Sequence, residues 1–401
     1  MAFAPKPALA IASLVLPEPG APQPVSRRLR IALVIERFEP HAGGVERAAW
    51  EVARGLAAAG DEVHVVARHS EPADFATAHR VRAPDAWQPL RVLGFSRAAA
   101  RSAPRGAFDV VHSFSRTRHQ DLYRAGGGSH ADYMTRRYGR FAAPLRLLSP
   151  RHAVLLAIER RVFADASQSI LCPSRMVADE LARRYAIPAE RLAVIHNGVD
   201  LERFHPGRRA RLRGELRGAA APVWLLLGSG WWRKGLDTAL RALAAGRPRA
   251  ASLWVAGRDD PAPWRRLAAR LGVGDRVRFL GERRDPEALY AAADALLLPT
   301  RYDPFANASL EAAACGIPVV TSAADGCSEV LGDGAWVVAD AEDTTGFAAA
   351  LEALAEPSVR EVRGAAARRA AERLGWDRHL ALLRDLYLRI ATRAGRSAAA
   401  C

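Results

Sequence analysis

Residues 299 to 322 read Pro-Thr-Arg-Tyr-Asp-Pro-Phe-Ala-Asn-Ala-Ser-Leu-Glu-Ala-Ala-Ala-Cys-Gly-Ile-Pro-Val-Val-Thr-Ser, and this stretch decides the expected fold. Short apolar runs at 294–300 and 317–321 are typical of buried parallel strands. The alanine-rich residues between them favour a helix. The stretch therefore predicts a strand, loop, helix, strand unit of an α/β fold.

The expected helix has a start signal and a stop signal. Asn307 or Ser309 is expected to cap its N-terminus, because short polar side chains accept hydrogen bonds from the first backbone amides. Gly316 is expected at the C′ position, where glycine tolerates left-handed backbone. A helix N-terminus with free amides attracts phosphate. The amides expected to open this helix belong to Phe305, Ala306, Asn307 and Ala308.

Two carboxylates, Asp303 in the loop and Glu311 in the helix, flank this helix start. Carboxylates there can hold hydroxyl groups of the units that a diphosphate joins. The pattern therefore predicts a site for a nucleoside diphosphate sugar, with Glu311 on the ribose and Asp303 on the sugar hydroxyls. The alternative is that Asp303 and Pro304 merely start a turn and that Glu311 lies on a solvated helix face.

This stretch resembles the Glu-x(7)-Glu signature of retaining glycosyltransferases, with Asp303 where that family usually has its first Glu. The resemblance covers nearly the whole chain. It implies an α/β protein of two Rossmann-like domains that face each other across a cleft, the GT-B fold. The implied parts are an acceptor-side domain at 29–200, a nucleotide-sugar-binding domain at 201–375, and a helix at 376–395 that crosses back to the first domain.

Length and composition agree with two globular domains. A chain of 401 residues is too long for one ordinary core. The net charge of +15 raises the alternative of a nucleic-acid-binding protein, but arginine is dispersed along the chain and no nucleic-acid-binding module is recognisable. We therefore expect no nucleic-acid partner. The cysteines lack paired spacing, which favours reduced thiols at Cys172, Cys315, Cys327 and Cys401.

The composition of the first 28 residues predicts a disordered tail. An apolar run at 8–16 follows Lys6 and has the length of a signal-peptide core. However, the proline-rich segment 17–24 stands where a small-residue cleavage site would be expected. We therefore expect a cytoplasmic protein.

The first domain is expected to open with a strand, a loop and a helix that begins at Gly43 and Gly44. Glycines there let a backbone approach a ligand closely, although a plain tight turn would explain them equally well. Further along, three glycines precede His130. The resemblance implies that His130 faces the cleft and contacts the donor sugar or the acceptor, the alternative being an ordinary surface histidine.

The second domain is expected to begin with a strand that leads through Gly228 into a loop carrying Arg233 and Lys234. The loop lies at the carboxyl end of the strand, where ligands of α/β sheets bind. Lysine occurs at only two positions, Lys6 and Lys234, so a lysine in this loop is informative. We expect both cations to bind the diphosphate and to stabilise the leaving group. The alternative is a lysine placed by chance on a solvated loop.

The segment 133–163 combines many arginines with aromatic and aliphatic residues. Such a segment can lie on an anionic membrane surface. This interpretation predicts a peripheral protein at the inner face of the inner membrane. The alternative is a pair of helices packed on their own domain with a solvated arginine face.

Within the family, the sequence is most similar to bacterial lipopolysaccharide core glucosyltransferases. The likeness rests on 228–237, 256–259 and 294–299. It implies UDP-glucose as donor, a lipid-linked saccharide as acceptor, and no cofactor. No Asp-x-Asp motif appears, which suits a metal-independent mechanism. A nucleotide-sugar epimerase remains an alternative enzyme, while a phosphorylase lacks a second lysine for pyridoxal phosphate.

Overall fold

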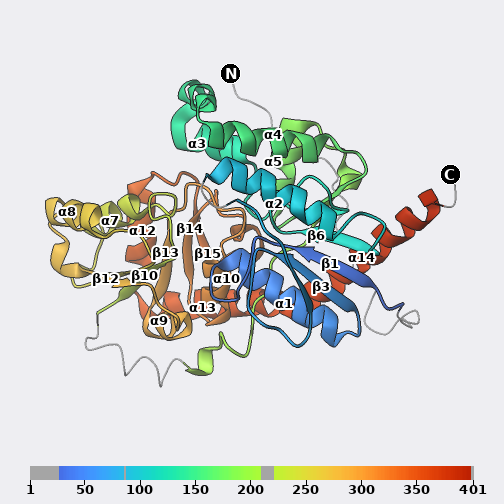
Figure 1. Cartoon of the computed structure of the whole chain (residues 1–401). Helices are drawn as coiled ribbons and strands as arrows, with labels where there is room; N and C mark the ends of the chain where they lie inside the picture. The colour runs from blue at the N-terminus through green and yellow to red at the C-terminus, as the bar shows by residue number, and fades with distance from the viewer. Residues whose placement is uncertain (1–26, 85–86, 209–220, 399–401) are drawn as a thin grey trace. The chain divides into compact units, whose positions relative to one another are not determined.

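The computed structural model describes residues 27–84, 87–208 and 221–398 (Figure 1). The predicted tail at 1–28 falls almost wholly outside these residues. The chain divides into two compact units. The first contains residues up to His196 and those from His379 onward, and the second contains Asn197–Arg378. Within the described residues, none of the helices combines the length and apolar character needed to cross a bilayer.

The described part of the first unit is built on a parallel sheet. Its strands occur in the order β5 (Thr77–Arg80), β3 (Glu62–Ala67), β1 (Arg30–Val34), β6 (Val110–Ser113), β7 (Leu122–Arg124), β8 (Ser169–Cys172) and β9 (Leu192–Val194). A separate two-stranded pair joins β2 (Arg37–Phe38) to β4 (His69–Ser70). The helices that connect the strands are α1 (Gly44–Ala58), α2 (Gln88–Ser102), α3 (His130–Ala142), α4 (Pro150–Ala164) and α5 (Arg175–Tyr185), with the 3₁₀ turn η1 (Pro144–Leu148) between α3 and α4.

The second unit repeats this plan with a parallel sheet of its own. Its strands occur in the order β12 (Val277–Gly281), β11 (Ser252–Ala256), β10 (Val223–Leu227), β13 (Ala295–Leu298), β14 (Val319–Ser322) and β15 (Ala335–Val338). Its helices are α7 (Leu236–Ala245), α8 (Ala262–Arg270), α9 (Pro286–Ala292), α10 (Asn307–Ala314), α11 (Ser328–Leu331), α12 (Thr344–Ala353) and α13 (Pro357–Glu372). The predicted fold of two parallel-sheet α/β domains is therefore confirmed.

The strand order of each sheet reverses at one point. In the second unit the chain runs outward from β10 through β11 to β12, and then returns to place β13 on the other side of β10. The loops that follow β10 and β13 diverge at this switch point, which is where open α/β sheets bind ligands. The two central strands β10 and β13 are almost wholly buried and apolar, as parallel strands covered on both faces must be.

The last helix, α14 (Trp376–Ala398), begins in the second unit and has most of its length in the first. Its Tyr387 hydroxyl lies 2.6 Å from Nδ1 of His112, a residue of β6 in the middle of the first sheet. Arg384 pairs at 3.0 Å with Asp61, whose side chain is fully buried. These contacts attach α14 to the first unit through buried polar groups as well as apolar packing.

Helix α13 packs closely against the end of α10. A Cβ atom on Gly364 of α13 would lie 2.3 Å from the carbonyl oxygen of Gly316, the residue after α10 and its C-cap. Neither backbone can yield without moving its helix. Glycine at 364 is therefore required by this close approach.

We predict that Gly364→Ala lowers the free energy of unfolding by about 1–3 kcal/mol, the usual cost of overpacking a core. The matched control is Gly395→Ala in α14, where an added Cβ would meet no atom within 4 Å. There the helix propensity of alanine should stabilise the protein by about 0.5–1 kcal/mol. Chemical denaturation of both variants checks the opposite signs, and an equally stable Gly364→Ala variant would contradict the packing argument.

Candidate active site

The candidate site lies at the switch point of the second sheet, where the loops after β10 and β13 contact each other. Gly235 has a φ of 76°, and a Cβ there would lie 1.9 Å from the carbonyl oxygen of Pro299. Only glycine permits this contact. The carbonyl oxygen of Arg233 accepts hydrogen bonds from the Arg301 amide at 2.8 Å and the Thr300 hydroxyl at 3.0 Å. The two loops are therefore held together by their own backbones.

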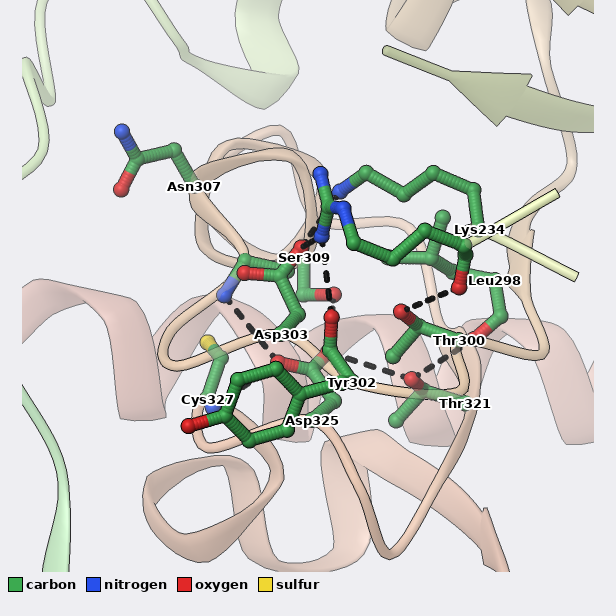
Figure 2. A network of polar contacts seen from close by, with 12 residues as sticks. Lys234, Leu298, Thr300, Tyr302, Asp303, Asn307, Ser309, Thr321, Asp325 and Cys327 are labelled. Atoms are coloured by element: carbon green, nitrogen blue, oxygen red, sulfur yellow. Dashed lines mark hydrogen bonds and ion pairs between the residues drawn. The ribbon is translucent and has the colours of Figure 1, made fainter. Parts of the chain in front are cut away.

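The Asp303 carboxylate joins the two predicted cations (Figure 2). Its Oδ2 accepts a hydrogen bond from Nζ of Lys234 at 2.7 Å and one from the Arg233 guanidinium at 2.8 Å. Arg233 also donates to the Tyr302 carbonyl at 3.0 Å. Burial raises the pKa of Asp303, but the charges and hydrogen bonds of Lys234 and Arg233 outweigh it and lower that pKa to about 2. We call Asp303, Arg233 and Lys234 the charge cluster.

The charge cluster carries one negative and two positive charges, so it has a net charge of +1. Lys234 is only 6% exposed, and its stem passes Gly228, where a Cβ would lie 3.2 Å from Cε of the lysine. Gly228 has a φ of 119°, which other residues rarely adopt. Gly228 was predicted to bind the donor. In this structure, its lack of a side chain leaves room for the stem of Lys234.

The N-terminus of α10 is capped differently from the prediction. Ala306 occupies the N-cap position, and neither Asn307 nor Ser309 caps the helix. The Asn307 side chain instead accepts a hydrogen bond from Asn197 at 2.7 Å. The prediction of an Asn307 or Ser309 cap was wrong because the acceptor for the first amide comes from a distant part of the chain. Gly316, with a φ of 70°, does follow the helix at C′ as predicted.

That acceptor is Asp325, a buried residue that the sequence reasoning missed. Its Oδ1 accepts hydrogen bonds from the amides of Ala306 at 3.1 Å and Cys327 at 2.9 Å. Its Oδ2 accepts from the hydroxyls of Ser309 at 2.7 Å and Thr321 at 3.1 Å (Figure 2). One carboxylate thus fixes the start of α10, the end of β14 and the loop between β14 and α11.

The backbones around the two aspartates are also paired. The Asp303 amide donates to the Ala324 carbonyl at 2.9 Å, and the Gly326 amide donates to the Asp303 carbonyl at 2.9 Å. Burial and the nearby negative charge of Asp303 raise the pKa of Asp325 to about 6, although its hydrogen bonds oppose the rise. The Asp-Gly pair at the carboxyl end of a predicted strand was the available signal for this residue.

Glu311 lies one turn into α10, and its Oε2 accepts a hydrogen bond from the Tyr290 hydroxyl at 2.9 Å. Tyr290 is a fully buried residue of α9. Burial, followed by the charge of Glu311, raises the pKa of Tyr290 well above its usual value. The Tyr290 hydroxyl therefore stays protonated, donates to Glu311 and fixes the rotamer of that side chain. Helix spacing in the sequence could not reveal this contact. The predicted ribose contact of Glu311 stays a prediction.

The first unit contributes three predicted residues, which we describe within that unit alone. Gly43 is the N-cap of α1 with an extended backbone, and Gly44 is the first residue of the helix. His130 is the first residue of α3, and its Nε2 lies 3.0 Å from Nδ1 of His152. Burial, assisted by Arg116 and His152, lowers the pKa of His130 to about 3, so its imidazole is neutral at physiological pH. Sequence reasoning missed this histidine pair.

Among the residues that the structure describes, no group of three or more histidine, cysteine or acidic side chains is placed to hold a metal ion. Three cysteines, Cys172, Cys315 and Cys327, are buried and form no disulfide bond within the part of the chain that the structure describes. Cys401 lies outside the described residues.

Two family models match the chain. The Glycosyltransferase Family 4 model matches residues 42–203, and the Glycosyl transferases group 1 model matches residues 221–356. A "Probable transglycosylase" of Burkholderia thailandensis is 32% identical over 86% of this chain and 93% of its own length. A D-inositol 3-phosphate glycosyltransferase of Saccharomonospora viridis is 34% identical, but the match covers only 57% of each protein.

Solved structures share the fold. WaaG, a glycosyltransferase involved in lipopolysaccharide biosynthesis, aligns with a TM-score of 0.79 and 24% identity over 89% of this chain and 99% of its own. Sucrose-phosphate synthase of Thermosynechococcus elongatus aligns with a TM-score of 0.76 and 23% identity over 91% of this chain and 100% of its own. The two parallel-sheet units are therefore those of the GT-B fold. The chain belongs to the glycosyltransferase family.

Asp325 gives a testable dependence of stability on pH. Its pKa is raised from 3.8 to about 6 in the folded protein, so the folded state binds this proton more tightly than the unfolded state. Its contribution to stability is therefore largest below pH 3.8 and is lost as the pH rises to about 6. Asp303, whose pKa is lowered, titrates below this window.

We predict that the free energy of unfolding of the wild type falls, relative to that of Asp325→Asn, by up to about 3 kcal/mol between pH 3.8 and 6. Chemical denaturation at a series of pH values measures this difference. The control, Asp275→Asn, removes an exposed carboxylate of the same unit and should keep the wild-type pH profile. A pH-independent difference for Asp325→Asn would refute the raised pKa.

Proposed function

We propose that this protein is a retaining glycosyltransferase that moves glucose from UDP-glucose to a lipid-linked saccharide of the lipopolysaccharide core type. The observation that carries the donor class is the charge cluster beside the start of α10. Two fixed cations and a helix N-terminus meet at the switch point of the second sheet, which matches the charge of a diphosphate. Retention of configuration rests on the likeness to the Glu-x(7)-Glu signature.

The proposed chemistry uses the cluster to stabilise the leaving group. When the bond between the anomeric carbon and the diphosphate breaks, negative charge grows on the leaving oxygens and positive charge grows on the sugar. Arg233 and Lys234 would bind those oxygens, and the first amides of α10 would supply further donors. Donors that are already held in place need no reorganisation during the reaction, so they favour the transition state over the ground state.

The carboxylates have separate proposed roles. Asp303 holds both cations through Oδ2, which leaves Oδ1 as the oxygen for a sugar hydroxyl. Glu311, oriented by Tyr290, would bind the ribose. Structures of HepE from Anabaena with UDP-glucose share this fold at a TM-score of 0.65, over 92% of this chain and all of that one, which agrees with a UDP-sugar donor. At 18% identity that likeness concerns the fold only.

The acceptor is proposed from the lipopolysaccharide-related neighbour and from the surface of the first unit. Phe141, Leu145 and Leu148 are large apolar residues that are 68–87% exposed on α3 and η1. Arg137 and Arg151 lie exposed in the same region. We propose that this surface docks on the inner face of the inner membrane, because apolar anchors combined with arginines favour anionic lipid. Arg136 pairs at 2.8 Å with the buried Glu180, so we do not include it among the proposed membrane contacts.

A second candidate acceptor is a soluble polyol phosphate. The name of the Saccharomonospora relative, a D-inositol 3-phosphate glycosyltransferase, favours it. The two candidates differ in whether the acceptor is fixed in a bilayer. A panel of nucleotide sugars, offered with each acceptor class and followed by nucleotide release, separates them.

We predict that UDP-glucose supports transfer and that Lys234→Met lowers kcat/KM at least tenfold, because it removes a charge-assisted hydrogen bond worth about 1.5–3 kcal/mol. Arg241→Ala, an exposed cation on α7, is the matched control and should keep full activity. Lys234→Met also leaves the buried Asp303 with one cation, so the Tm of this variant should fall below that of the wild type. The double variant Lys234→Met/Asp303→Asn should recover the wild-type Tm and remain inactive. Wild-type kcat/KM in Lys234→Met would remove the cluster from the mechanism.

Membrane docking predicts that Phe141→Ser/Leu148→Ser binds anionic vesicles about tenfold more weakly, since two apolar side chains no longer enter the interface. Val362→Ser is the control, because Val362 is an exposed apolar residue of the second unit. Vesicle sedimentation measures binding, and activity on a soluble, delipidated acceptor should stay unchanged. Equal sedimentation of the double variant and the wild type would rule out this docking surface.

A further inference from the structure

A pocket of about 490 Å³ opens in the first unit. This volume lies within the range of roughly 300–1,000 Å³ that small-molecule sites have. Four elements, α3, η1, α4 and α5, or the residues beside them, supply its walls. The lining residues are Ala131, Met134, Thr135, Ala143, Pro144, Leu156, Arg160, Arg184 and Tyr185.

The floor of this pocket is apolar. Met134, Ala143 and Leu156 are buried and form a small hydrophobic cluster of their own. Pro144 adds a further apolar wall. An unbranched methionine side chain adapts its shape to a flexible ligand. The floor therefore suits a hydrocarbon chain better than a sugar, whose hydroxyl groups would find few partners there.

The polar groups at the pocket differ in how they are engaged. Arg184 pairs with Asp132, and the hydroxyl of Tyr185 donates to Glu159. Arg160 is exposed, and no hydrogen bond or ion pair engages it among the residues that the structure describes. A free cation beside an apolar floor is complementary to an amphiphile that carries a negative head group.

Two lining residues belong to the chain segment that carries the exposed apolar residues. Phe141 lies two residues before Ala143, and Leu145 and Leu148 follow Pro144 in the same short segment. The residues that would enter a lipid surface are therefore close in the chain to residues that line the pocket. An acyl chain could pass from the bilayer into the pocket without crossing water, which avoids exposing its apolar surface.

We propose that the pocket binds one acyl chain of an anionic bilayer lipid, with the head group at Arg160. The inference deepens the proposed membrane docking by assigning an individual lipid site. It remains testable when docking fails, because a soluble amphiphile can reach the pocket without a membrane.

The first experiment titrates the full-length protein with cis-parinaric acid, a fluorescent fatty acid, and with the corresponding neutral alcohol, both as monomers. The wild type should bind the acid more tightly than the alcohol. Arg160→Gln should weaken binding of the acid about threefold to fivefold and leave the alcohol unchanged. Arg161→Gln, a neighbouring exposed arginine that does not line the pocket, should bind both like the wild type.

The second experiment fills the pocket. Thr135→Trp, at a half-buried lining position, and Ala143→Trp, at the floor, should each abolish binding of both probes while circular dichroism shows a folded protein. Two positions keep the test decisive if one variant fails to fold. Wild-type binding by a folded pocket-filling variant would overturn the pocket assignment. Equal losses for acid and alcohol in Arg160→Gln would overturn the head-group assignment.

The source of the chain is tested with phosphatidylcholine vesicles that contain a photoreactive phosphatidylglycerol. Cross-links should map to 131–160 in the wild type and disappear in Thr135→Trp. Absence of these cross-links in the wild type would overturn the bilayer source. Binding of UDP, measured by calorimetry on the same variants, reports the donor site of the transferase proposal separately, because the charge cluster lies in the second unit.

Discussion

The pairing of one buried carboxylate with two cations constrains the whole second unit. Asp303, Arg233 and Lys234 stand on loops from adjacent strands, so their contact requires β10 and β13 to lie side by side. Removing Asp303 would leave the buried ammonium group of Lys234 without a compensating charge, which is far more costly than losing an exposed ion pair. The close backbone contact at Gly235 serves the same requirement, since it sets the separation of the two loops.

A second buried carboxylate, Asp325, lies in the loop whose backbone pairs with that of Asp303. The two aspartates differ in their proton affinity. Asp303 faces two cations, whereas Asp325 faces neutral amides and hydroxyls beside the negative charge of Asp303. Their pKa values therefore move in opposite directions from a common starting value. The Asp325 carboxylate accepts a hydrogen bond from the Ala306 amide at the start of α10, so its negative charge offsets part of the helix dipole.

The elements of the second unit were largely predictable because their signals are local. The strand, loop and helix around 299–322 follow from apolar runs, small residues and Gly316. These signals depend only on residues that are close together in the chain. Asp325 was not predictable in the same way, because its partner amide at Ala306 is 19 residues away. Tyr290 escaped for the same reason, since its hydroxyl meets Glu311 only after α9 and α10 have packed. Similarly, the partner of Arg136 is 44 residues further along the chain.

The rarity of lysine in this protein has a practical consequence. Only Lys6 and Lys234 carry an ε-amino group, and only Lys234 belongs to the charge cluster. A lysine-specific isotope label would therefore place two ammonium signals in a nuclear magnetic resonance spectrum of a 401-residue protein. One of them would report directly on the proton exchange and hydrogen bonding of the amine beside Asp303. Because the basic residues of this protein are almost all arginines, the signal of a single lysine nitrogen can be assigned to the charge cluster.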